Sequence, residues 1–139
     1  MIWGKKKQPR NSSVKTLISR QTEVRGDVKF SDGMYIEGTI NGNVIAEDDN
    51  SLLILNENGT IEGEVKVPFV KLNGVVIGDV HVSEHVELMS KARITGNVYY
   101  NLIEMAIGAE VNGKLVHSQE AEDVPLAIAN STDTLEVSD

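Results

Sequence analysis

The chain of 139 residues contains no cysteine, three prolines and few aromatic side chains. Without cysteine, neither a disulfide framework nor a thiolate metal site is available. No apolar stretch of the sequence approaches the length of a membrane span, and none has the form of a signal-peptide core. Valine and isoleucine are abundant, and because β-branched side chains favour strands, we expect an all-β core.

The net charge of −8 is unevenly distributed. Residues 1–20 carry six basic and no acidic side chains, residues 21–117 carry 7 basic and 15 acidic, and residues 118–139 carry six acidic and no basic. A protein that wraps nucleic acid needs a basic face, so we expect no nucleic-acid partner. We predict a basic disordered tail (1–13), a repeat domain (14–117) and an acidic disordered tail (118–139).

A five-residue phrase of the form apolar–any–Gly–polar–apolar recurs six times, with glycines separated by 16, 21, 15, 18 and 17 residues. The copies are VRGDV (24–28), INGNV (40–44), IEGEV (61–65), VIGDV (76–80), ITGNV (94–98) and VNGKL (111–115). Six units of about 17 residues, each with an apolar face that it cannot bury alone, predict a single-domain parallel β-helix, or solenoid, of about six coils. An antiparallel sandwich is the alternative, but sandwiches rarely repeat one phrase in phase.

Each unit should hold three short strands whose apolar residues point inward. The inward set includes Val24, Val28, Ile40, Val44, Ile61, Val65, Val80, Ile94 and Val98. The glycine stands between two of these residues either because a side chain would crowd the interior or because the strand bends there. In the second and fourth units the connection before the phrase is shorter, with Ile36 leading to Ile40 and Leu72 to Val76.

The sequence offers no recognisable catalytic group, cofactor motif or phosphate-binding glycine loop. His81 and His85 are four residues apart, which is a metal-ligand spacing on a helix but not on a strand, so we expect no metal site there. The residues after the glycines should stack in one outward column, where Glu64 and Asp79 are like-charged neighbours. The column has two interpretations, a weak divalent-cation site and a solvated stripe, of which the stripe is the simpler.

No amphipathic helix flanks the repeats, so the first coil (16–30) and the last coil (103–117) should remain open. Open end coils expose strand edges and apolar side chains to which another chain can add. We therefore expect polymerisation through the end coils. The residues expected in the contact are Ile18, Val24, Val28 and Phe30 at one end, and Met105, Val111 and Leu115 at the other.

With these repeats, a basic N-terminal tail and a polar C-terminal tail, residues 14–117 resemble the bactofilin family. The resemblance implies a right-handed, triangular parallel β-helix that assembles without nucleotide, through paired like ends. It also implies a cytoskeletal scaffold in the bacterial cytoplasm, at the inner membrane, that positions cell-wall enzymes or other client proteins. It implies no enzyme activity and no cofactor.

The opening segment MIWGKKK places Met1, Ile2 and Trp3 before Lys5, Lys6 and Lys7. Tryptophan favours the membrane interface and lysine is attracted to anionic lipid, so the segment is a candidate membrane-targeting head. A solubilising start segment is the alternative, and the resemblance favours anchoring.

Two other functions compete with a scaffold. One is a monomeric β-helix that presents its side faces to a partner, as in the cell-division inhibitor family with a related C-terminal β-helix. The other is an acyltransferase of the left-handed hexapeptide class, whose six-residue phase the observed intervals break repeatedly. The apolar island PLAIA (125–129) in the acidic tail is either a client-docking peptide or without function.

Overall fold

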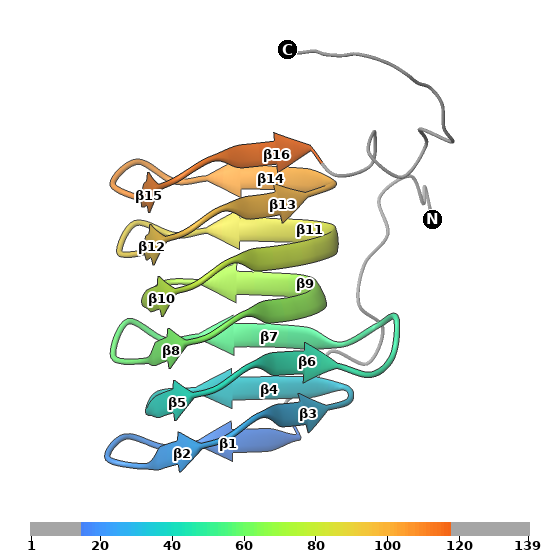
Figure 1. Cartoon of the computed structure of the whole chain (residues 1–139), viewed down its shortest axis with the longest axis vertical. Coiled ribbons are helices and arrows are strands. Elements are labelled where there is room, and N and C mark those ends of the chain that lie inside the picture. Colours follow the sequence, from blue (N-terminus) through green and yellow to red (C-terminus); the bar gives the residue numbers. More distant parts are fainter. Residues whose placement is uncertain (1–14, 118–139) are drawn as a thin grey trace.

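The computed structural model describes residues 15–117, which form sixteen β-strands and no helix. The chain winds around three faces, and its successive turns stack into a solenoid of six coils (Figure 1). In Figure 1 the strands nearer the viewer run left to right, and those behind run right to left as the chain rises, so the solenoid is right-handed. The predicted all-β parallel β-helix of about six coils is confirmed, whereas the predicted tails lie outside the described residues.

Each face is a ladder of parallel strands. The first face contains β1 (Thr16–Ile18), β4 (Gly33–Ile36), β7 (Leu52–Leu55), the second parts of β9 (Val65–Leu72) and β11 (Val80–Leu88), and β14 (Leu102–Met105). The second face contains β2 (Glu23–Arg25), β5 (Thr39–Asn41), β8 (Thr60–Glu62), β10 (Val75–Ile77), β12 (Arg93–Thr95) and β15 (Glu110–Asn112). The third face contains β3 (Val28–Phe30), β6 (Val44–Ala46), the first parts of β9 and β11, β13 (Val98–Tyr100) and β16 (Leu115–His117).

The core lies between the three faces and includes the residues that the repeat predicted to point inward. Val24 and Val28 of the first coil are half-buried. The others are fully buried: Ile40, Val44, Ile61, Val65, Val80, Ile94 and Val98. Because equivalent positions are in register from coil to coil, their side chains form continuous apolar columns along the solenoid axis.

The glycine of each phrase marks a bend between two faces. The second-face strand ends immediately before the glycine, and the third-face strand begins two residues after it, so the two apolar residues of the phrase point inward from different faces. These six glycines have φ between +126° and +158°, a conformation that L-residues rarely adopt. At Gly63, an added Cβ would also lie 2.1 Å from the carbonyl oxygen of Gly42 in the preceding coil.

The residues that follow these glycines form the predicted outward column, and their side chains bond coil to coil. The backbone N–H of Asn43 donates to Asp27 Oδ1 at 3.0 Å, and the N–H of Glu64 donates to Asn43 Oδ1 at 2.9 Å. Higher up, Asp79 accepts from the N–H of Asn97 in the same way. In the described chain Glu64 accepts no such bond from Asp79, because its longer side chain does not place an oxygen over that N–H.

Connection lengths differ between coils at the other two corners. The short connections predicted from Ile36 to Ile40 and from Leu72 to Val76 are confirmed. At the corner between the third and first faces, residues 47–51 form a projecting loop between β6 and β7 (Figure 1), which takes up the extra length of the 21-residue interval. β9 and β11 instead pass this corner without interruption.

We expect Gly63→Ala to lower the free energy of unfolding more than Gly26→Ala does. Both positions have a strained φ, which costs an alanine about 1–3 kcal/mol, but nothing lies within 4 Å of a Cβ added at Gly26. The added Cβ at Gly63 meets backbone that cannot move without separating two coils. Guanidinium denaturation followed by circular dichroism measures both changes, and equal losses would contradict the close-approach argument.

Candidate functional site

The two ends of the solenoid carry strands with one unpaired edge. β1, β2 and β3 pair only with the next coil, and β14, β15 and β16 pair only with the preceding coil. Within the described residues, no strand covers the other edge of these six. Each end therefore presents backbone N–H and C=O groups on three sides, which is a template for a further coil.

The C-terminal end exposes positions that are core positions in every interior coil. Leu115 is 43% exposed and Met105 is 47% exposed, whereas their register partners Val98 and Leu88 are fully buried. Val111, which completes the predicted contact set at this end, is half-buried. The last coil is thus a cross-section of the hydrophobic core that the described residues leave open.

Two further exposed apolar residues at this end were missed in the sequence. Ile107 is 98% exposed at the tip of the turn between β14 and β15, and Leu102 is 48% exposed at the start of β14. The equivalent turns of the other long connections carry Arg20, Glu57 and Ser90 at the position of Ile107. The sequence offered one signal for the exposure of Ile107, namely an apolar residue at a turn position that is polar in the other long connections.

The N-terminal end presents less apolar surface. Ile18 and Phe30 are buried, and Val24 and Val28 are half-buried. Leu17 points outward from β1 and is exposed, a feature that inward periodicity does not reveal. The two ends are therefore unequal, with the larger open apolar surface on the last coil, and the part that each residue takes in assembly stays a prediction.

The candidate membrane-targeting head, Met1, Ile2, Trp3, Lys5, Lys6 and Lys7, lies outside the described residues. In the part of the chain that the structure describes, nothing qualifies as a membrane-spanning helix.

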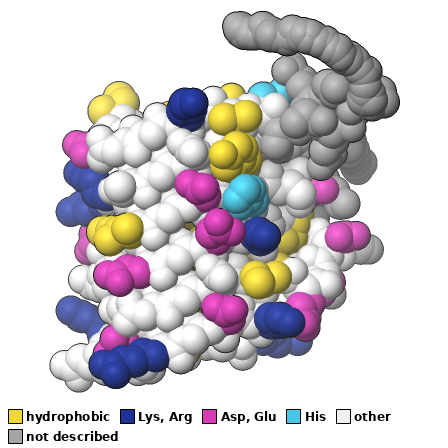
Figure 2. All heavy atoms as spheres, viewed as in Figure 1, with side chains coloured by type: hydrophobic (Ala, Val, Ile, Leu, Met, Phe, Trp, Pro, Cys, Tyr) yellow, Lys and Arg dark blue, Asp and Glu magenta, His cyan; other side chains and the backbone are white. Residues whose placement is uncertain are grey.

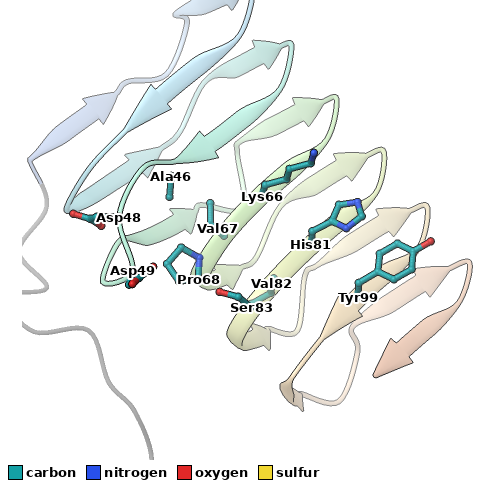
Figure 3. Close-up of a pocket in the computed structure, with 10 residues that line it drawn as sticks. All are labelled: Ala46, Asp48, Asp49, Lys66, Val67, Pro68, His81, Val82, Ser83 and Tyr99. Carbon is teal, nitrogen blue, oxygen red and sulfur yellow. The ribbon is translucent and has the colours of Figure 1, made fainter. Parts of the chain in front are cut away.

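The third face carries an open groove of about 400 Å³ beside the loop 47–51. Figure 3 shows Lys66, His81 and Tyr99 side by side along it, with Asp49 in the loop itself and Ser83 on β11. A nucleophile must lie within hydrogen-bond reach of its base. Among residues 15–117 no hydrogen bond joins Ser83 to His81, whose ring stacks on Tyr99.

The histidines of β11 have separate partners. The ring of His81 stacks on Tyr99, with centroids 4.6 Å apart and planes 8° apart. His85 Nε2 lies 3.7 Å from a carboxylate oxygen of Glu104. The two side chains therefore form no shared histidine site.

Comparison with known proteins agrees with this geometry. A family model for bactofilins, described as polymer-forming cytoskeletal, matches residues 16–116. Bactofilin BacO of Myxococcus xanthus (strain DK1622) is 25% identical over 100 residues, which cover 72% of this chain and 77% of BacO. Bactofilin BacP of the same organism is 22% identical over 100 residues, so the chain spans only 40% of that relative. No solved structure matches.

The family match begins in the first coil and ends in the last, so it covers the complete solenoid. Its description as polymer-forming agrees with a structure whose terminal strands are each paired on one edge only. The chain belongs to the bactofilin family of polymer-forming cytoskeletal proteins.

Proposed function

We propose that this bactofilin assembles end to end, through its first and last coils, into nucleotide-independent filaments that lie on the cytoplasmic face of the inner membrane. The observation that carries the proposal is the last coil, whose core positions Met105 and Leu115 are exposed while the same positions one coil earlier are fully buried. A coil from a second subunit covers these side chains and pairs with the free strand edges.

The free energy available at such a contact is sufficient only if several groups act together. Full burial of one leucine or methionine side chain contributes about 1.5–3 kcal/mol, whereas association costs about 4–15 kcal/mol in lost freedom of motion. The exposed parts of Leu102, Met105, Ile107 and Leu115 amount to little more than two whole side chains. Burying them contributes roughly 3–7 kcal/mol at each end, and hydrogen bonds along the free edges add to this free energy. No nucleotide is required, because the contact consists of core and backbone groups alone.

The C-terminal end exposes more apolar surface than the N-terminal end, and this difference favours pairing of like ends. Two C-terminal coils related by a two-fold axis bring both exposed apolar surfaces together. A head-to-tail contact would place that surface against the first coil, where Ile18 and Phe30 are already buried. Subunits would then alternate in direction along the filament.

On the membrane, the filament would act as a scaffold that binds anionic lipid through the head MIWGKKK and positions cell-wall enzymes or other client proteins. One head gives weak attachment, but a polymer presents many heads at once and their avidity multiplies. The acidic tail, with its PLAIA segment, is a candidate docking site for clients. A monomeric binding module is the alternative function, and size-exclusion chromatography separates the two because only a scaffold elutes as large assemblies.

We expect Leu115→Arg to leave a folded solenoid of low assembly order, because it places a charge where the end contact excludes water, at a cost of several kcal/mol. Thr95→Arg is the matched control, since Thr95 is an outward, exposed residue of β12. Negative-stain electron microscopy and analytical ultracentrifugation measure assembly, and circular dichroism checks the fold. Ile107→Lys should act like Leu115→Arg without touching the core of the subunit. Normal filaments from both Leu115→Arg and Ile107→Lys would show that assembly runs through the side faces.

We also expect removal of residues 1–7 to release the protein from anionic liposomes while leaving filaments intact in solution. Each lysine near an anionic surface contributes about 1 kcal/mol, so losing three of them weakens lipid binding by about two orders of magnitude at low salt. Trp3→Glu should act in the same direction, and raised salt should weaken binding of the parent. The measurement is liposome co-sedimentation.

The assembly variant tests avidity in the same assay. Leu115→Arg has an intact head, so it should bind lipid weakly because each subunit acts alone. If the truncated protein sediments with liposomes as well as the parent does, MIWGKKK is not the anchor and the attachment proposal fails, whereas the end-coil proposal is unaffected.

A further inference from the structure

The third face brings together two carboxylates and an imidazole from neighbouring coils. Glu64 follows the corner glycine of the third coil, Asp79 occupies the same position in the fourth coil, and His81 lies two residues later in β11. One ligand atom from each of these side chains lies within 4.8 Å of the other two. Figure 2 shows acidic side chains beside a histidine on this face of the solenoid.

Register explains why these three residues meet. β9 pairs with β11 so that Val65 is opposite Val80, which stacks the preceding residues Glu64 and Asp79. His81 is outward in the same strand segment, as are Lys66 below it and Tyr99 above it. The four-residue spacing in the sequence drew attention to His81 and His85 as a pair of metal ligands. In the structure the potential ligands near His81 are instead Glu64 and Asp79 of the outward column.

Two of the three ligand groups are held in place by contacts that leave a ligand atom free. Asp79 uses Oδ1 to accept the backbone N–H of Asn97 at 2.9 Å, which leaves Oδ2 available. The His81 ring is held against Tyr99, which restricts its rotation. Among the residues of the outward column that have a next coil in the described chain, only Glu64 has a side chain that accepts no backbone N–H from that coil. Its carboxylate is therefore not engaged with the next coil.

The charge of the cluster favours a cation. Glu64 and Asp79 are the only acidic neighbours in this column, and like charges opposite one another in a sheet are destabilising. Lys66 is the nearest basic residue by register, but within residues 15–117 it makes no ion pair with either carboxylate. A divalent cation between the carboxylates would offset their repulsion.

We propose that Glu64, Asp79 and His81 bind one divalent transition-metal ion, with zinc as the best match, and that the ion links the third coil to the fourth. Two carboxylate oxygens and one imidazole nitrogen are a ligand set that zinc accepts, with the remaining position open to water. Ligand atoms on one tetrahedral zinc ion lie ~3.3–3.6 Å apart, given bond lengths of ~2.0–2.2 Å. Side-chain rotations must therefore close separations of up to 4.8 Å to bring the three atoms onto one ion.

The test is equilibrium dialysis of the full chain against zinc chloride at neutral pH, with bound metal measured by elemental analysis. The variants are chosen to remove one ligand each without disturbing the fold. Asp79→Asn keeps an oxygen for the N–H of Asn97, Glu64→Gln keeps size, and His81→Phe keeps a ring against Tyr99. The controls are His85→Ala and Glu62→Gln, which remove a histidine and an acid outside the cluster.

We expect one zinc ion per parent chain, affinity at least about ten-fold lower in each ligand variant, and parent affinity in both controls. Lys66→Gln should bind zinc more tightly, because it removes a positive charge beside the site. Zinc should raise the thermal unfolding midpoint of the parent and leave that of His81→Phe unchanged. The proposal is overturned if the parent binds no stoichiometric zinc, or if the three ligand variants bind it as well as the parent does.

Discussion

The stacking of each coil on the next by parallel backbone hydrogen bonds is the constraint on which the other features depend. The N–H of Gly42 donates to Glu62 O at 2.9 Å, and the N–H of Val44 donates to Glu64 O at 2.8 Å, with equivalent bonds at the same corner of the coils above. From the second coil onward, the positive φ at this corner would direct an added Cβ at the carbonyl group of the corner glycine in the preceding coil. Glycine is therefore required there, and side chains must repeat in register.

The same constraint accounts for the proposed assembly surface. The strands of an interior coil are hydrogen-bonded to a coil on each side, and these two neighbouring coils bury its core side chains. The last coil also has apolar residues, Met105, Val111 and Leu115, at its core positions, but in the described chain it has a neighbouring coil on one side only. The proposed end contact thus requires no dedicated binding motif, since it uses the same kinds of group that join the coils within a subunit, namely apolar core side chains and free strand edges.

The repeat predicted the fold and the inward residues well, because both follow from periodicity. It left the role of glycine open, since a crowded interior and a bend produce the same pattern of residues. The proximity of His81 to Glu64 and Asp79 could not be predicted, because it depends on the register of two coils joined by connections of unequal length. The exposure of Met105 and Leu115 likewise depends on where the solenoid ends, which periodicity does not encode.

X-ray fibre diffraction from aligned filaments, grown without nucleotide, tests end-to-end assembly most directly. If subunits join through their end coils, the solenoid axis is parallel to the filament axis, and the ~4.8 Å coil spacing appears as a reflection on the meridian. If subunits join through their side faces, the solenoid axes lie across the filament and the same reflection moves to the equator. A meridional reflection is the result that this structure predicts, and an equatorial one would contradict it.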